Sequence, residues 1–199
     1  MGQKVIELTC PGCGARIANR QEICEWCHKP VIVSSFNSMD SLSPIEINKY
    51  AASYRKALAE NPDDSDLNIS AGMCYMKLKQ YDKAFEAFEK AMEDNFDNSE
   101  MYFYAAISLL KGKQPFATPK ANVDKAMDYI RSATMLENRG IYYFVLAYLA
   151  YDYYSRKMLN TRPGYKEYLQ NAVQYGVTSS DIQCAFELMG CEVPAALLG

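Results

Sequence analysis

From residue 44 onward, apolar and small side chains recur at the spacing of amphipathic helices. One pattern consists of an aromatic residue, an alanine three positions later and a third residue five positions after the alanine. It occurs as Tyr54, Ala57 and Pro62, and it recurs 34 residues later as Phe88, Ala91 and Phe96. Such a period is typical of stacked helical hairpins. Small residues such as Gly72 and Ala84 let two helices approach closely, and aromatic residues such as Tyr75 fill the groove beside them.

Capping signals predict where the first and last of these helices begin. Ser43 is the expected N-cap of the first helix, with Pro44 at its first position and Glu46 completing a capping box. A second capping box at Ser180–Gln183 is expected to open a last helix that stops at Gly190. Its apolar face is expected to seal the final hairpin, and it consists of Ile182, Phe186 and Met189.

The first 33 residues hold too few apolar side chains for a core, so another interaction must fold them. Two cysteine pairs lie there, Cys10/Cys13 and Cys24/Cys27, separated by ten residues. Four thiolates on one tetrahedral Zn²⁺ would supply the folding free energy. Pro11 and two glycines permit the tight turns, and the strand-like runs 5–8, 15–17 and 31–33 alternate with them. This order predicts a zinc ribbon with one structural zinc ion.

Two alternatives concern the same cysteines. A pair of disulfides would require an oxidising compartment, whereas the first ten residues contain no apolar signal region. The longest apolar run covers 11 residues, which is too short to cross a membrane, and an odd number of remaining cysteines suits reduced thiols: Cys74, Cys184 and Cys191. We therefore expect a cytoplasmic protein. The second alternative, that His28 competes with Cys27 as a ligand, stays open.

Residues 10–28 resemble the short bacterial zinc-ribbon family, whose pattern is CPxCG, a ten-residue arm and a second CPxCG. The chain departs from this pattern at Glu25, which replaces proline, and at His28, which replaces the second glycine. The resemblance implies a four-cysteine zinc site and suggests a bacterial source. The zinc ligands are expected to be Cys10, Cys13, Cys24 and Cys27.

The helical part resembles the tetratricopeptide repeat over roughly residues 45–175. The best match is the repeat at 65–98, whose signature positions are held by Gly72, Tyr75, Ala84, Phe88 and Ala91. The next repeat begins at Ser99 and is stretched between Gly112 and Asn122, and a third covers 140–174. The resemblance implies a mainly α, α-α solenoid of about eight helices. The expected domains are the ribbon at 1–33, a serine-rich linker at 34–43 and the repeats at 44–199.

The resemblance also implies a partner-binding groove lined by one stripe of each first helix. Carried onto this chain, the stripe consists of Asp66, Ile69, Met73, Met76, Glu100, Phe103, Ile107, Leu110, Phe144, Tyr148 and Tyr151. An apolar stripe rich in methionine and aromatic residues suits an amphipathic helix or an extended hydrophobic peptide. The alternative is that some of these residues are core, covered by the chain's own loops or linker.

Composition argues against a catalytic function and against binding of nucleic acid. His28 is the only histidine, and the sequence contains no phosphate-binding, nucleophile-elbow or metalloprotease motif. Lys and Arg number 21 against 24 acidic residues, without a clear basic cluster, so the chain lacks the usual source of phosphate affinity. Trp26 is the best candidate for base stacking.

Several tyrosines crowd the helix near residue 148. They predict that this helix is enclosed by the rest of the chain or by another subunit.

These observations predict a non-catalytic adaptor or scaffold that binds another protein or peptide through its repeats. The zinc ribbon would be structural or supply a second contact, and the expected partners include neither a membrane nor nucleic acid. Two alternatives remain, a nucleic-acid-associated zinc-ribbon factor and a sensor of zinc or redox state. A basic face on the folded ribbon would favour the first, and easy release of metal the second.

Overall fold

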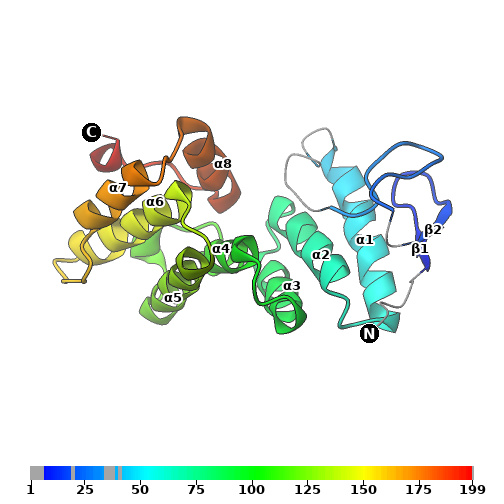
Figure 1. Cartoon of the computed structure of the whole chain (residues 1–199), viewed down its shortest axis with the longest axis horizontal. Coiled ribbons are helices and arrows are strands. Elements are labelled where there is room, and N and C mark those ends of the chain that lie inside the picture. The colour runs from blue at the N-terminus through cyan, green and yellow to red at the C-terminus, as the bar shows by residue number, and fades with distance from the viewer. Residues whose placement is uncertain (1–6, 19–20, 34–38, 40–41, 199) are drawn as a thin grey trace. The chain divides into compact units, whose positions relative to one another are not determined.

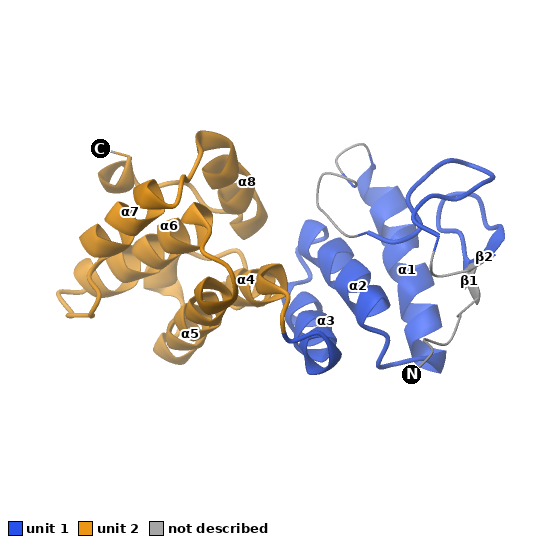
Figure 2. Ribbon diagram, in the orientation of Figure 1, with its two compact units in different colours: residues 1–96 blue, residues 97–199 orange. Residues whose placement is uncertain are grey.

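A computed structural model describes residues 7–18, 21–33, 39 and 42–198 and divides the chain into two compact units. The first unit is Met1–Phe96 and the second is Asp97–Gly199 (Figure 2). Most of the predicted linker, namely residues 34–38 and 40–41, lies outside the described residues, as does the start of the first predicted strand. The predicted division into 1–33, 34–43 and 44–199 stays a prediction.

The ribbon at the front of the first unit is built on a two-stranded antiparallel sheet. Strand β1 (Glu7–Thr9) pairs with β2 (Arg16–Ala18), and Leu8 lies opposite Ile17. The third predicted strand, 31–33, is wrong, because the structure forms only an isolated bridge between Ile23 and Pro30. Val31 and Val33 are nevertheless buried, and they hydrogen-bond to helix side chains in place of a strand.

Three helices complete the first unit, and they are α1 (Pro44–Glu60), α2 (Ser65–Lys77) and α3 (Tyr81–Asp94) (Figure 1). The predicted capping box at Ser43 and Glu46 is present. Helices α2 and α3 form the expected hairpin, and α1 packs on α2. A Cβ at Gly72 would lie 2.7 Å from the ring of Phe88, so the small residue is what permits this helix approach.

The second unit repeats the hairpin twice. Its elements are α4 (Ser99–Ser108), the 3₁₀ turn η2 (Pro115–Ala117), α5 (Lys120–Leu136), α6 (Gly140–Leu149), the π-helical turn η3 (Ala150–Ser155), α7 (Tyr165–Gln174), α8 (Ser179–Met189) and the 3₁₀ turn η4 (Ala195–Leu197). Helix α4 pairs with α5, and α6 pairs with α7. With eight α-helices in the described residues, the prediction of a mainly helical chain is confirmed.

The stretched second repeat is held in place by the π-helical turn. The carboxylate of Asp152, which is only 2% exposed, accepts a hydrogen bond of 2.7 Å from the backbone N–H of Phe116 and pairs with Arg156. The Phe116 ring lies 4.6 Å from the guanidinium carbon of Arg156 and 4.8 Å from the amine of Lys157. These contacts connect the inserted turn η2 to the end of α6.

The tyrosine-rich helix is enclosed on most of its surface. Tyr142, Tyr148 and Tyr153 are buried, whereas Tyr143 and Tyr151 remain partly exposed and pack on Tyr175 and Tyr165 at 5.0 and 5.2 Å between ring centroids. Neighbours within the chain therefore enclose much of the helix, and self-association stays a prediction. Among the described residues, no helix has both the length and the apolar content that crossing a bilayer requires.

Helix α8 differs from the prediction in its start and in its packing. Thr178 is its N-cap and forms a capping box with Asp181. The hydroxyl of Thr178 accepts from the backbone N–H of Asp181 at 3.1 Å, and the carboxylate of Asp181 accepts from the backbone N–H of Thr178 at 3.1 Å. The predicted box at Ser180–Gln183 is wrong by two residues. Gly190 ends the helix with a φ of +65°, as expected. The helix packs on α6 and α4, the first helices of the two hairpins.

Candidate metal centre and partner-binding surfaces

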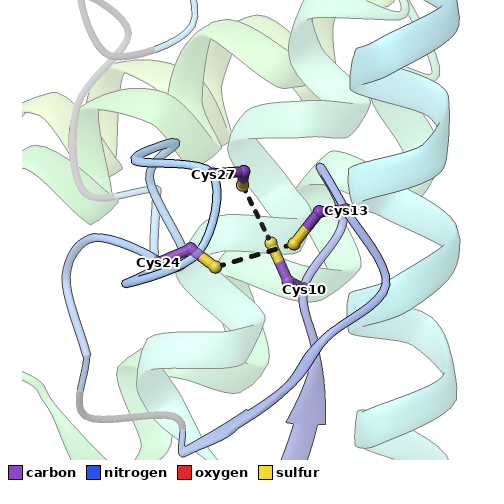
Figure 3. A group of neighbouring side chains, drawn as sticks. All are labelled: Cys10, Cys13, Cys24 and Cys27. Carbon is purple, nitrogen blue, oxygen red and sulfur yellow. Dashed lines mark hydrogen bonds between the residues drawn. The ribbon is translucent and has the colours of Figure 1, made fainter.

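Four cysteine sulfurs meet at one point of the ribbon. The Sγ atoms of Cys10, Cys13, Cys24 and Cys27 all lie within 4.8 Å of one another (Figure 3). The Cys10–Cys27 and Cys13–Cys24 pairs are 3.6 and 3.8 Å apart. Tetrahedral Zn²⁺ with Zn–S bonds of about 2.3 Å places its sulfurs roughly 3.8 Å apart. The cluster therefore has the dimensions of a metal site.

The same distances speak against the disulfide alternative. A disulfide requires sulfurs about 2.05 Å apart. All seven cysteines fall within the described residues, and no disulfide joins any two of them. Cys74, Cys184 and Cys191 do not belong to the group of four ribbon sulfurs, and among the described residues no second group of possible metal ligands includes them.

The two cysteine knuckles share one backbone design. The N–H of Gly14 donates to the carbonyl of Cys10 at 2.8 Å, and the N–H of His28 donates to the carbonyl of Cys24 at 2.8 Å. Gly14 has a φ of +80° and His28 a φ of +55°. His28 thus occupies the left-handed position that glycine holds in the first knuckle. Its side chain is exposed and does not belong to the group of four ligating residues.

The thiols ionise unequally because their surroundings differ. Burial raises the pKa of the Cys10 thiol to about 12. The backbone N–H of Cys27, directed at the sulfur, is the main reason that the pKa of Cys24 falls to about 7. Metal ions bind thiolates, so loading the site displaces protons, and the Cys10 thiol is one of their sources.

Helix α1 forms the floor of the ribbon. The hydroxyl of Tyr50 donates to the carbonyl of Pro30 at 2.8 Å, and that of Tyr54 donates to the carbonyl of Val31 at 2.6 Å. The hydroxyl of Ser53 donates to the carbonyl of Thr9, at the end of β1, at 2.8 Å. Sequence reasoning treated Tyr54 as a repeat position and missed this contact. The four-residue spacing of Tyr50 and Tyr54 is the only local signal for it.

The tip of the second knuckle presents apolar side chains to solvent. Trp26 is 75% exposed and Ile23 is 59% exposed. Trp26 therefore covers neither the sulfur cluster nor a strand. Large exposed aromatic residues of this kind are enriched at protein interfaces.

In the first unit, the predicted groove residues of α2 fall into two groups. Asp66 is exposed and Ile69 is half-buried, whereas Met73 and Met76 are each only 2% exposed. Met73 and Met76 thus belong to the packed interior of the described chain, and Asp66 and Ile69 are open to a partner. A binding role for any of the four stays a prediction.

In the second unit, most of the predicted groove residues are covered. Glu100 forms an ion pair of 2.5 Å with Arg139, and Tyr151 is half-buried against Tyr165. The remaining five are at most 5% exposed, and they are Phe103, Ile107, Leu110, Phe144 and Tyr148. Phe186 of α8 packs on two of these, with ring centroids 6.1 Å from Phe144 and 4.8 Å from Tyr148.

Comparison with known proteins agrees with this architecture. Residues 51–111 match the family model described as Tetratricopeptide repeat. No curated protein matches the sequence.

Three solved structures show a similar fold. The structure titled "Crystal structure of MamA" is 16% identical, with a TM-score of 0.57 over 78% of this chain and 84% of that one. "MamA RS-1 ArsTM double mutant" is 14% identical, with a TM-score of 0.55 over 70% of each chain. "MamA AMB-1 P212121" is 18% identical, with a TM-score of 0.52 over 74% of each chain. At these identities the likeness concerns the fold alone.

Proposed function

We propose that this protein is a non-catalytic adaptor whose tetratricopeptide repeats bind an amphipathic helix or an extended hydrophobic peptide of a partner protein. The main support is the repeat match at 51–111, because stacked hairpins of this kind present first-helix faces to partners. The chemistry of the described residues agrees, since the only histidine is exposed on a knuckle. The proposed setting is the cytoplasm of a bacterial cell.

We further propose that the ribbon holds one structural Zn²⁺ on Cys10, Cys13, Cys24 and Cys27. Four thiolates form the closed coordination shell of structural zinc and leave no open position for a reacting water molecule. The sulfur separations of 3.6 and 3.8 Å support this ligand set. Because α1 bonds both halves of the ribbon, the metal would also hold the exposed Trp26 in a defined position as a second contact surface.

The adaptor role is tested by quantitative affinity purification from the native host. Variants Ile69→Glu and Tyr151→Glu each place a charge on a half-buried predicted groove position without entering the core. We expect one specific partner to be lost with either variant and retained with Glu93→Lys, which changes an exposed residue of α3. Unchanged capture by both groove variants, with loss in Trp26→Ala, would move the interface to the ribbon.

One observation favours a second candidate function, association with nucleic acid. A groove of about 780 Å³ lies between the first knuckle and α1, and three cationic side chains line it, Arg16, Lys49 and Lys56. Only one carboxylate, that of Glu60, shares this lining. A set of cations along one groove is the usual source of phosphate affinity.

A salt titration of gel shifts with duplex and single-stranded probes separates the two functions. Phosphate contacts make affinity fall steeply with salt, and Lys49→Glu/Lys56→Glu would then abolish the shift while Lys166→Glu, in the other unit, would not. Absence of any shift at low salt would remove this candidate and leave the adaptor proposal unaffected.

A further inference from the structure

Helix α8 occupies the face that a binding partner of the second unit would use. It packs on α6 and α4, which are the first helices of the two hairpins (Figure 1). The second helices α5 and α7 pair with α4 and α6, respectively. First helices supply the binding face in stacked repeats, so the chain's own last helix lies on it.

The contact resembles recognition of an amphipathic helix in a groove. Phe186 is the anchor, since its ring is 3% exposed and lies 4.8 Å from the Tyr148 ring and 6.1 Å from the Phe144 ring. Ala185 and Met189 are also buried, and Ile182 is half-buried. These residues have the i, i+3, i+4, i+7 spacing by which a helix anchors itself in an apolar groove.

The face beneath α8 contains a buried polar group. Tyr148 is fully buried, and its hydroxyl lies beside the thiol of Cys191. That thiol itself donates to the carbonyl of Met189 at 3.5 Å. Sulfur is a weak hydrogen-bond acceptor, so a ligand group that accepts from or donates to the Tyr148 hydroxyl would satisfy it better. Helix α8 therefore fills the apolar part of the face and supplies only a weak partner to its polar group.

The connections of α8 are compatible with release. It follows the turn at Gly176, which has a φ of +71°, and begins with an exposed capping box of its own. After Gly190 the described chain contains only the short turn η4, in which Leu197 is buried. Release of α8 would also free this turn, and it would leave the α4/α5 and α6/α7 hairpins intact.

We propose that the face formed by α4 and α6 is a docking site for a partner helix and that α8 is its built-in competitor. The partner is an amphipathic helix with an aromatic anchor and apolar residues at the spacing of α8, together with a polar group that reaches the Tyr148 hydroxyl. Like α8, whose only charged residues are Asp181 and Glu187, it carries few or no basic residues on the flanks of its apolar stripe. This inference rests on the proposed adaptor function and names its ligand class and its regulation.

Competition sets the apparent affinity of the site. When α8 covers the face in most molecules, the dissociation constant of a partner rises by the inverse of the uncovered fraction. Weakening α8 should therefore strengthen binding of a helix added in trans. A permanently packed core helix predicts the opposite, because its loss would damage the face.

The probe is a fluorescent peptide of residues 177–191, kept reduced, and its binding to the full chain is followed by anisotropy. We expect Phe186→Ala to bind the peptide at least about tenfold more tightly than the wild-type chain. Glu187→Ala, at an exposed position of α8, should match the wild type, and a peptide carrying Phe186→Ala should bind neither chain.

Hydrogen exchange on the same variants decides the remaining outcomes. One possible result is faster exchange confined to α8 in Phe186→Ala, with α4–α7 still protected. If the affinity for the peptide also rises, this result supports the proposal. If the affinity does not rise, the same exchange pattern overturns it. Loss of protection through α4–α7 would show that α8 is core, and unchanged protection of α8 in both Phe186→Ala and Phe186→Asp would show that it cannot be displaced. Partner capture through Ile69 is independent of all of these results.

Discussion

The phenolic hydroxyl of Tyr54 donates a 2.6 Å hydrogen bond to the backbone carbonyl of Val31, and both residues are fully buried. Tyr54 belongs to α1, and Val31 belongs to the segment that leaves the second cysteine knuckle. The bond crosses from the ribbon to the first helix of the repeats. The ribbon and the first three helices therefore form one unit, and changes in the metal site should reach α1.

Removing the Tyr54 hydroxyl tests this coupling. Tyr54→Phe leaves the buried carbonyl of Val31 without its partner, so we expect the free energy of unfolding of the first unit to fall by about 1–3 kcal/mol. Chemical denaturation followed by fluorescence of Trp26 measures the change. Ser53→Ala is the matched control, because its bond to Thr9 is exposed and should contribute less. Equal losses in the two variants would contradict a buried coupling through Tyr54.

Removal of the metal should affect the two units differently. We expect one zinc ion per chain by atomic emission, and loss of that ion in Cys10→Ser and Cys24→Ser, while Cys184→Ser retains it because Cys184 lies outside the cluster. Structural zinc supplies an apparent ~10–16 kcal/mol to small ribbons, so a strong chelator should unfold the ribbon. Hydrogen exchange should then rise in the ribbon and in α1 but remain unchanged in α4–α7. Full protection of the ribbon after chelation would refute a structural metal.

Substitutions of His28 separate its backbone role from a role as ligand. With a φ of +55°, His28 occupies the region that costs an L-residue roughly 1–2 kcal/mol. His28→Gly should keep the zinc stoichiometry and leave stability equal or up to about 1 kcal/mol higher. His28→Val should keep the metal with lower stability, because a β-branched residue is poorly tolerated there. Loss of zinc in His28→Gly would identify the imidazole as a ligand.

Two helix glycines should respond differently to the same added methyl group. A Cβ at Gly72 would meet the Phe88 ring at 2.7 Å, whereas one at Gly140 would meet the backbone nitrogen of Val177 at 2.3 Å. A ring can shift more readily than backbone, so Gly72→Ala should cost about 1–3 kcal/mol and Gly140→Ala more. Thermal unfolding of both variants gives the order. A smaller effect at Gly140 would mean that Val177, next to the start of α8, moves readily.

Short-range patterns account for the predictions that succeeded. The cysteine knuckles, the capping box at Ser43 and the small residue Gly72 opposite Phe88 depend on neighbours a few residues away or on a repeat of fixed length. The third predicted strand failed for a long-range reason. Val31 and Val33 have the composition of a strand, yet the hydroxyls of Tyr54 and Ser70 take up their backbone groups.

The amino-acid sequence alone determined that four cysteines form one cluster and that paired helices follow, since turn geometry and helix periodicity are local properties of the chain. Tertiary structure decided where the ribbon rests and what covers α4 and α6. An apolar stripe such as Ile182, Phe186 and Met189 specifies that a helix must be buried, and it does not specify against which surface. That choice depends on which apolar face remains open after the hairpins have packed, and in the second unit it is the face of Phe144 and Tyr148.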